Sequence, residues 1–468
     1  MNSKKIFAIA LSAAMLAGCS SGSSAAKSSK SSASVSNDRV YMLNFKPETN
    51  DAWQALAKKY NDLGGNVKVV TAASGEYNTQ LTSQMADDKT APTIFNVGNT
   101  AAAQTWDDYT LDLAGSDLEN HLTDKSYELK YNDKVAGIAN CYESYGIIYN
   151  KTILDAYCGL DNAVVSSPDD IKDFDTLKKV SDDIQSRIDE INKALSGTAF
   201  DGTLTEAWTS SGLDSGSSWR FSGHLAGIEL YYEFKDDNAD TLAGEPEIKG
   251  TYLDNFKNVW DMYTTDTAAN KADLENGTYD AEGEFGMGEA VFYQNGDWEF
   301  GNLTNEENGY LVTADDLGYM PIYFGVDDKN EGLAVGTENY WAINSHASKK
   351  EQDASLAFLN WVITSDEGRD AVTNAMGLTT PFDTFTGDYA TKNVLAAKVA
   401  DYQKAGKTNV DWSFNATPNV DTWRADIVAP LTAYTKGKGS WDDFKTHFVN
   451  DWASEWKLAH ADDSTSSN

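Results

Sequence analysis

The sequence predicts an α/β fold with two packed cores, as indicated by its length and by two sets of β-rich runs. Beyond the N-terminal stretch lie roughly 430 residues, more than one typical domain contains. Since 41% of the whole chain is hydrophobic, this length is enough for two packed cores. Between residues 40 and 97, β-rich runs alternate with helical patterns, which is typical of a parallel sheet flanked by helices. Further β-rich runs start near residue 135, so we expect a second sheet.

The first sheet is predicted from β-rich runs at residues 40–45, 67–71 and 93–97. Helical spacing fills the intervals at residues 50–63 and 76–87. In a parallel sheet, the carboxyl ends of the strands form the crevice in which ligands bind. The residues that follow these strands, and that we expect at the crevice, are Asn44, Glu76, Tyr77 and Asn99.

The second sheet begins with β-rich runs at residues 135–142 and 145–150. A third run, at residues 290–298, ends in a turn that contains Gly296. A stretch rich in Gly and Ser at residues 196–223 predicts loops. Helical patterns cover residues 151–157, 169–195, 253–263, 353–364 and 441–458.

The N-terminus has the composition of an export signal. Lys4 and Lys5 precede an apolar run of about ten residues, roughly half the length that a membrane-spanning helix needs. The following Leu-Ala-Gly-Cys resembles the bacterial lipobox, whose cysteine receives a diacylglycerol. We therefore expect a signal peptide at residues 1–18 and a mature chain that begins with lipidated Cys19. Residues 19–37, mostly Ser, Ala, Gly and Lys, predict a disordered tether on the outer face of the cell membrane.

Charge and motif content narrow the classes of partner. The formal net charge of −35 repels nucleic-acid phosphates, so we expect no nucleic-acid partner, and it also disfavours an anionic ligand. Beyond residue 37 the sequence contains no HExxH, GxSxG or Walker-type glycine motif. We therefore expect no cofactor.

The cysteine content leaves a disulfide open. Cys141 and Cys158 form an even pair in a chain that carries an export signal. The sequence does not fix their geometry, so a bridge and two small buried thiols fit equally well.

An acidic segment has part of a calcium-loop pattern. Asp236, Asn238, Asp240 and Glu247 have the spacing of four ligand positions. Thr241 occupies the sixth position, where the loop needs glycine. A solvated acidic loop is therefore the preferred interpretation, and no metal is expected.

Several segments, taken in order, point to one protein family. Residues 285–298 combine a small-residue helix end, a strand and a Gly-x-Trp turn. Residues 332–344 form a Gly-rich strand, followed by a lysine-containing turn and an amphipathic helix that ends near residue 364. Ser144–Lys151 is a further strand. Together these segments resemble the extracellular solute-binding proteins that serve carbohydrate ABC importers, the group that contains maltose-binding protein.

The resemblance implies a two-lobed, periplasmic-binding-protein-like fold. Each lobe would be a mostly parallel sheet flanked by helices, with the ligand cleft between the lobes and a hinge that closes around the ligand. The N-terminal lobe would comprise residues 38–122 and 306–364, and the C-terminal lobe residues 123–305 and 365–468. The implied protein is a monomer without enzymatic activity that delivers a sugar to an ABC transporter permease.

A sugar ligand requires aromatic platforms for its C–H faces and polar partners for its hydroxyls. Trp298 follows the glycine turn and matches the family's stacking tryptophan, although a tryptophan of the core is the alternative. Of the neighbours Tyr340 and Trp341, strand alternation directs only one to the cleft, and we prefer Tyr340. For Glu76, a helix start is an equally good explanation of the carboxylate. The remaining candidates are Glu143, Trp219, Phe221 and Trp412.

Two other functions fit the sequence. A lipid-anchored glycoside hydrolase would also present aromatic residues and carboxylates in a cleft, and it needs two carboxylates across the scissile bond. With 72 acidic residues, counting does not exclude such a pair. A glycan-binding surface lipoprotein without a role in transport is the second alternative.

Overall fold

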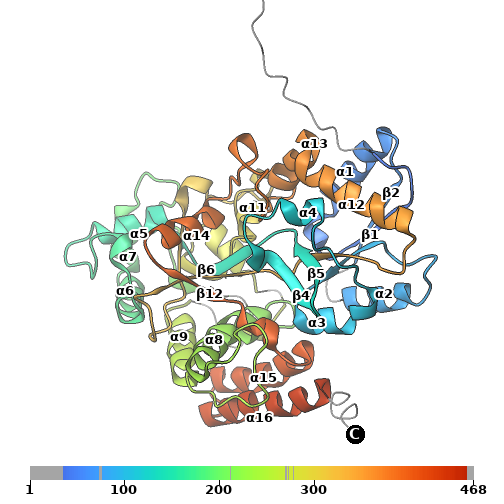
Figure 1. The fold of residues 1–468 in the computed structure, drawn as a ribbon. Coiled ribbons are helices and arrows are strands. Elements are labelled where there is room, and N and C mark those ends of the chain that lie inside the picture. The colour runs from blue at the N-terminus through green and yellow to red at the C-terminus, as the bar shows by residue number, and fades with distance from the viewer. Residues whose placement is uncertain are drawn as a thin grey trace, which may run out of the picture. The chain divides into compact units, whose positions relative to one another are not determined.

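Two mixed β-sheets organise the chain in the computed structural model (Figure 1). The structure describes residues 35–72, 76–210, 212–268, 271, 273–277 and 279–460. The predicted signal peptide, the lipidation site Cys19 and most of the predicted tether lie outside these described residues. Among the described residues, no helix combines the length and the apolar character that are needed to cross a membrane.

The first sheet has the strand order β2-β1-β3-β11-β5-β4. Strand β1 pairs in parallel with β2 and β3, as expected for this part of the chain. On the other side of β3, strands β11, β5 and β4 pair antiparallel, so the sheet is mixed. The bounds are β1 Val40–Asn44, β2 Val67–Thr71, β3 Ile94–Val97, β4 Glu128–Tyr131, β5 Lys134–Ala139 and β11 Tyr340–Ile343.

Helices bury both faces of the first sheet because alternate strand residues point in opposite directions. Met42 packs with Trp53 of α1 and Phe358 of α12 in one core cluster. Its neighbour Leu43 packs with Leu81 of α2 in another core cluster. The helices that accompany this sheet are α1 Asn50–Asp62, α2 Tyr77–Met85, α3 Thr100–Thr105, α4 Asp117–Asn120, α12 Lys349–Thr364 and α13 Asp366–Asp370.

The second sheet has the strand order β12-β10-β6-β8-β7, and β9 also pairs with β6. Strand β6 is antiparallel to β8, β9 and β10, whereas the pairs β7/β8 and β10/β12 are parallel. The bounds are β6 Glu143–Asn150, β7 Glu206–Thr209, β8 Ala290–Gly296, β9 Leu317–Met320, β10 Glu331–Gly336 and β12 Thr408–Asp411.

The largest core cluster lies around the second sheet and its helices. Helices α15 and α16 pack against each other through Trp423 and Trp452, whose ring centroids are 5.4 Å apart. The helices of this part are α5 Lys151–Cys158, α6 Phe174–Ser186, α7 Ile188–Ala194, α8 Ala226–Asp237, α9 Leu253–Thr265, α10 Ala281–Gly286, α11 Glu299–Leu303, α14 Val394–Lys404, α15 Val420–Thr435 and α16 Trp441–Ala459.

The chain crosses between the two sheets three times. The first crossing is at residues 140–142, between β5 and β6, and the second is at residues 337–339, between β10 and β11. The third lies between Phe382, in the core of the first sheet, and α14, which packs against the second sheet. The sequence analysis placed the crossings near residues 122, 305 and 365. The difference arises because β4 and β5 extend the first sheet, whereas β9 and β10 belong to the second.

Helix α8 carries two buried carboxyl groups one turn apart. Glu229 is 0% exposed and accepts the backbone N–H of Tyr252 at 3.1 Å. Glu233, 1% exposed, accepts the backbone N–H groups of Lys249 and Thr251. Burial, and then the charge of Glu233, raises the pKa of Glu229 well above its ordinary value. The two carboxyl groups thereby hold residues 249–252 on the helix.

We expect the substitution Glu229→Gln to flatten the dependence of stability on pH. The pKa of Glu229 is higher in the folded state than in the unfolded chain, so this group favours folding less as the pH rises above about 4.3. The loss is at most about 1.4 kcal/mol per pH unit. Urea denaturation between pH 5 and pH 8 should show the wild type losing stability relative to the variant, whereas the exposed control Glu307→Gln should follow the wild type. Parallel curves for Glu229→Gln and wild type would contradict this assignment.

Candidate functional site

Six aromatic side chains gather beside the two crossings that flank β6 and β11. His224 stacks on Tyr145 with ring centroids 4.1 Å apart, and its ring lies 5.3 Å from that of Trp298. Trp298 is also 5.9 Å from Trp219 and 6.5 Å from Trp412. We call this group the aromatic cluster, and its members are Tyr145, Trp219, His224, Trp298, Trp412 and Phe414.

Two glycines at strand ends make room for the tryptophans of the cluster. A Cβ atom at Gly296, the last residue of β8, would lie 2.2 Å from the indole of Trp298. A Cβ atom at Gly336, the last residue of β10, would lie 2.5 Å from the ring of Trp412. Side chains at these positions would push the indoles out of place, so the absence of a side chain is part of how the site is built.

Six buried polar atoms on or near the residues of the aromatic cluster have no hydrogen-bond partner within the described part of the chain. Nearly all buried polar groups of folded proteins are paired, so these six atoms need a physical reason. The donors and acceptors are mixed, since guanidinium and indole N–H groups stand beside amide oxygens. We call these atoms the unpaired polar set: Arg220 Nε, His224 Nδ1, Asn339 Oδ1, Trp412 Nε1, Asn415 Oδ1 and Arg424 Nε.

His224 is neutral in this environment. Its side chain is 4% exposed, and burial, followed by the positive charges of Arg424 and Arg220, holds its pKa well below the ordinary value. A neutral imidazole offers one donor and one acceptor, so His224 adds both kinds of group to the site.

An ion pair connects the first sheet to the start of the second. Lys46, two residues after β1, donates to Glu143, the first residue of β6, at 2.9 Å. Their side chains are only 11% and 12% exposed. Asp297 accepts the backbone N–H and the hydroxyl of Ser144 at 3.0 and 2.8 Å. Burial, and then the charge of Glu143, raises the pKa of Asp297 to about 8.

A small hollow lies along one side of Trp298. Its lining comes from both sides of the crossings, because residues 297–301 follow the second sheet and residues 376–379 follow the core of the first. Aromatic and carboxyl side chains face it together, namely Tyr142, Glu143, Asp297, Trp298 and Phe300. This is the mixture of apolar walls and few polar groups that small-molecule sites use.

The structure brings five of the sequence-predicted residues to this region. Trp219, Trp298 and Trp412 belong to the aromatic cluster, and Glu143 lines the hollow beside Trp298. Asn99 caps α3 through its side-chain oxygen, and its amide nitrogen donates to the backbone oxygen of Asn415 at 3.1 Å. Asn99 thus links the helix that follows β3 to the edge of the aromatic cluster.

Three residues that follow the first strands have other roles. Asn44 is 3% exposed, and its amide binds Lys46 O, Thr49 and Thr71, so it shapes the turn that positions Lys46. The hydroxyl of Tyr77 pairs with the backbone of residue 96 inside the core. Glu76 is exposed beside α2, where it borders a shallow surface hollow with residues 79–84 of that helix.

Two aromatic candidates pack into cores. Phe221 is 0% exposed, and its ring lies 4.5 Å from that of Trp260. Tyr340 is partly buried against the core cluster on the α2 side of the first sheet, and burial raises its pKa to about 12. Its neighbour Trp341 lies in the opposite core cluster, as the alternation of strand side chains requires.

Sequence reasoning placed Arg220 and Phe45 beside its candidates and missed four other residues of this region. Arg220 lies within the Trp219–Phe221 stretch, and its guanidinium stacks 4.3 Å from the Trp219 ring and donates to Glu299 at 3.2 Å. Phe45, adjacent to the candidate Asn44, is the exposed member of that pair and contacts Tyr77 edge-on at 5.3 Å. No motif in the sequence singles out Tyr145, His224, Phe414 or Arg424, because only the crossing of the chain brings them together.

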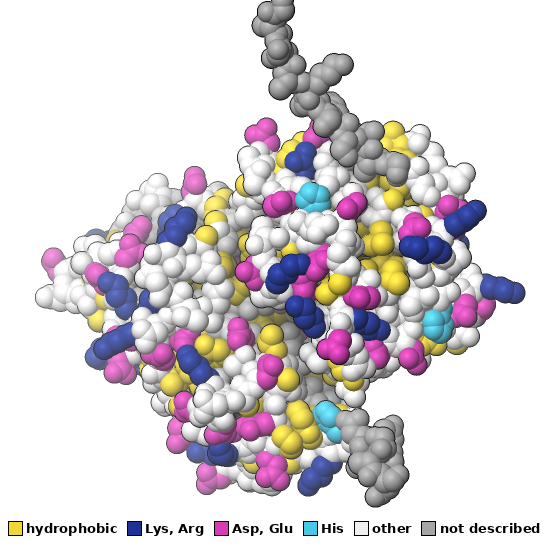
Figure 2. All heavy atoms as spheres, in the orientation of Figure 1, with side chains coloured by type: hydrophobic (Ala, Val, Ile, Leu, Met, Phe, Trp, Pro, Cys, Tyr) yellow, Lys and Arg dark blue, Asp and Glu magenta, His cyan; other side chains and the backbone are white. Residues whose placement is uncertain are grey.

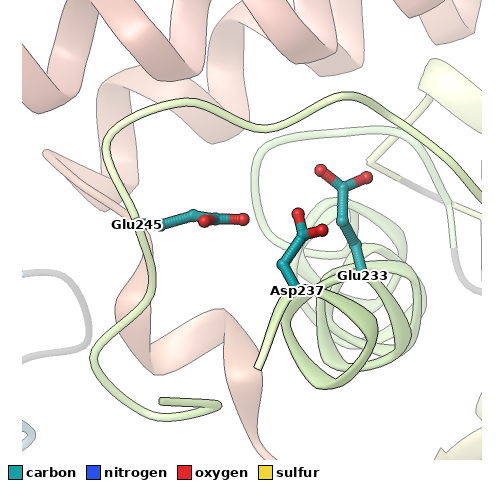
Figure 3. Close-up of side chains that lie close together, drawn as sticks. All are labelled: Glu233, Asp237 and Glu245. Carbon is teal, nitrogen blue, oxygen red and sulfur yellow. The ribbon is translucent and has the colours of Figure 1, made fainter. Parts of the chain in front are cut away.

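The acidic segment after α8 does not arrange its calcium-like residues around one point. Asp240 caps the backbone N–H of Leu242 at 2.9 Å, and Asp236 accepts the Tyr252 hydroxyl. The carboxylates that do approach one another come from α8 and the following loop, and they are Glu233, Asp237 and Glu245 (Figure 3). The ammonium of Lys249 binds Asp237, so a side chain of the protein supplies positive charge there.

No disulfide joins Cys141 and Cys158. Cys141 lies in the core cluster of the first sheet, whereas Cys158 ends α5 beside the second. The two thiols therefore belong to different parts of the fold.

Two sheets joined by three crossings, with aromatic and polar side chains between them, define a two-lobed binding-protein fold. A family model described as "Bacterial extracellular solute-binding protein" matches residues 52–398, and the chain belongs to this family. No curated protein matches the sequence significantly.

Solved structures share the fold at low sequence identity. A family 1 extracellular solute-binding protein from Bifidobacterium longum subsp. infantis is 20% identical with a TM-score of 0.59, and the match covers 89% of this chain and 98% of that one. The GacH receptor of Streptomyces glaucescens, solved unliganded and with acarbose, is 17% identical with a TM-score of 0.60, covering 91% and 98%. Maltose-bound MalE3 of T. maritima is 15% identical with a TM-score of 0.60, covering 90% and 99%.

We expect Lys46→Met to destabilise the protein by about 2–3 kcal/mol, because it leaves the mostly buried Glu143 carboxylate without its counter-charge. The control Lys58→Met removes an exposed ion pair with Asp62 on helix α1. It should lower the free energy of unfolding by less than about 0.5 kcal/mol. The double variant Lys46→Met/Glu143→Met should recover part of the loss, since both charges are gone. Urea denaturation followed by tryptophan fluorescence measures all three, and equal losses for Lys46→Met and Lys58→Met would contradict the assignment.

Proposed function

We propose that this protein binds a sugar or short oligosaccharide outside the cell membrane and delivers it to an ABC transporter permease. The observation that carries the proposal is the unpaired polar set that surrounds the aromatic cluster. Aromatic rings pack on the C–H faces of a sugar ring, and its hydroxyls need both donors and acceptors once they leave water.

The position of the cluster suits binding by closure. The chain crosses between the sheets at residues 140–142 and 337–339, and both crossings adjoin the cluster. In the proposed mechanism, each sheet with its helices forms one lobe, and these short segments absorb the hinge motion. The Asn99–Asn415 hydrogen bond joins the two sides, and a ligand between them would be enclosed when the lobes approach.

Proteins of similar structure support a carbohydrate ligand. They are a chitin oligosaccharide binding protein, RafE in complex with raffinose, and a MalE protein bound to maltotriose. These proteins are 14–15% identical to this chain, so the ligand itself is proposed from the site.

Binding is favoured over glycoside hydrolysis by the state of the carboxyl groups. A hydrolase needs two carboxyl groups that reach opposite sides of a glycosidic bond. Glu143 and Asp297 line the hollow beside Trp298, but Asp297 is occupied by Ser144 and Glu143 by Lys46. Both are held within the protein, which suits a positioning role rather than proton transfer to a ligand.

We expect isothermal titration to show binding of at least one member of a panel of maltose, raffinose, diacetylchitobiose and xylobiose, without hydrolysis products in the same samples. Trp298→Ala should weaken that binding at least about tenfold, because it removes a stacking face worth roughly 1.4 kcal/mol or more. Trp456→Ala, which removes a similarly half-buried tryptophan of α16, should leave binding unchanged. Cleaved sugar would favour the hydrolase, and the absence of binding to any sugar of the panel would contradict the sugar-binding proposal.

The proposed location is the outer face of the cell membrane, through a diacylglycerol on Cys19. The lipobox-like sequence supports this, and a monomer fits delivery of one ligand at a time. We expect Cys19→Ser to abolish incorporation of labelled fatty acid into the protein and to release it from the membrane fraction of a lipoprotein-processing bacterium. Cys158→Ser is the matched control and should remain anchored. Continued labelling of Cys19→Ser would place the lipid elsewhere.

A further inference from the structure

Two opposite charges lie near the aromatic cluster without forming an ion pair with each other. Glu338 lies in the crossing at residues 337–339, and Arg424 lies on α15. Within the described part of the chain, neither side chain makes an ion pair or a hydrogen bond, and Arg424 Nε is buried without a partner. Burial lowers the pKa of Arg424 and raises the pKa of Glu338. The charge of each group partly opposes the pKa shift of the other. The two groups are therefore near enough to interact through space, yet they are separated.

One short helical turn lies beside both residues. Asn415 donates from its side chain to the backbone oxygen of Thr337 at 3.3 Å, which fixes the position of the Glu338 segment against the helical turn Ser413–Ala416. Arg424 approaches the same turn, with its guanidinium 5.6 Å from the centroid of the Phe414 ring. The turn thus contacts the backbone next to Glu338 and also lies beside the Arg424 guanidinium, at the edge of the aromatic cluster.

We propose that Glu338 and Arg424 are specificity-determining residues that a hydroxyl-bearing ligand bridges, so that the site selects a neutral saccharide over the corresponding uronic acid. This inference rests on the proposed function. A hydroxyl can donate to the Glu338 carboxylate while it accepts from Arg424, which satisfies both charges at once. A carboxylate on the ligand could accept from Arg424 but would be repelled by Glu338.

The other charges of the site strengthen the selection against an acid. Arg220 is already engaged by Glu299, and Lys46 by Glu143, so neither is available as a new counter-ion. Figure 2 shows acidic and basic side chains mixed over the face that it draws, and the chain carries a net charge of −35. Around Glu338 itself, the positive charges of Arg424 and Lys46 act against the negative charges of Glu143 and Asp421. A ligand carboxylate that binds here would therefore lose its hydration without full compensation.

A double-mutant cycle tests the bridge with whichever panel sugar binds. Glu338→Gln and Arg424→Gln should each weaken binding about tenfold, since each removes a hydrogen bond to a charged group. The double variant should also bind about tenfold more weakly rather than about a hundredfold, because one bridged hydroxyl is lost in every case. Glu367→Gln and Lys350→Gln, exposed charge changes on α13 and α12, should have no effect.

The acidic counterpart of the same sugar tests the selection itself. Wild type should bind the neutral sugar at least about tenfold more tightly than its uronic acid, and Glu338→Gln should narrow that ratio. The thermal midpoint of Arg424→Gln shows whether this variant folds. If it does not fold, Arg424→Lys replaces it in the test, because lysine keeps the positive charge but lacks the planar guanidinium group. Additive losses, or a uronic acid that binds as tightly as the neutral sugar, would overturn the inference while leaving sugar binding intact. The absence of binding to any sugar of the panel would contradict the proposed function and, with it, the inference.

Discussion

The antiparallel register of β6 is the constraint on which the site depends. In this register Tyr145 is opposite Gly296 of β8, and Glu143 is opposite Gly336 of β10. The two strand-end glycines therefore lie on either side of the start of β6, and the tryptophans that fold over them, Trp298 and Trp412, must approach each other. A shift of one residue would turn every side chain of β6 to the other face and separate the cluster.

The same strand connects the site to the rest of the fold. Because β6 begins directly after a crossing, its first residue can pair with Lys46, which follows a strand of the first sheet. Asp297 then binds the backbone and the hydroxyl of Ser144 and brings the end of β8 to the same point. Packing, strand pairing and electrostatics thus converge within a few residues, so the proposed hinge and the proposed binding surface share one segment.

The sequence predicted the fold class better than the boundaries of the sheets. The three parallel strands of the first sheet and Trp298 follow from local patterns, namely alternating elements and a glycine turn. The crossings do not, since a β-rich run such as β5 does not indicate which sheet it joins. Asn44 shows a second limit, because its place at the end of a strand predicted a position in the crevice, whereas its buried amide stabilises the turn and Phe45 is the exposed neighbour.

Residues of the site that lack a sequence signal share a physical reason. His224 lies in a helical stretch that looks like ordinary core, and its role comes from Tyr145 and Trp298, which are distant in sequence. Arg424 directly follows the core residue Trp423, and one position along a helix turns a side chain by about 100°, from the core toward the site. Such residues are found by asking which buried polar atoms lack partners, a property that exists only after the chain has folded.

Unpaired buried groups also explain why a ligand would matter to the conformation of the protein. Each such group costs about 1–3 kcal/mol when it lacks both water and a partner, so a closed, ligand-free cluster is disfavoured. Opening the crossings would return these atoms to water, whereas a ligand with both donors and acceptors would pair them in the closed form. A ligand shifts a conformational equilibrium only by the difference between its affinities for the two states. A ligand that forms hydrogen bonds with more of these atoms would therefore shift the equilibrium further toward the closed form. The groups that recognise the ligand would thereby also control closure.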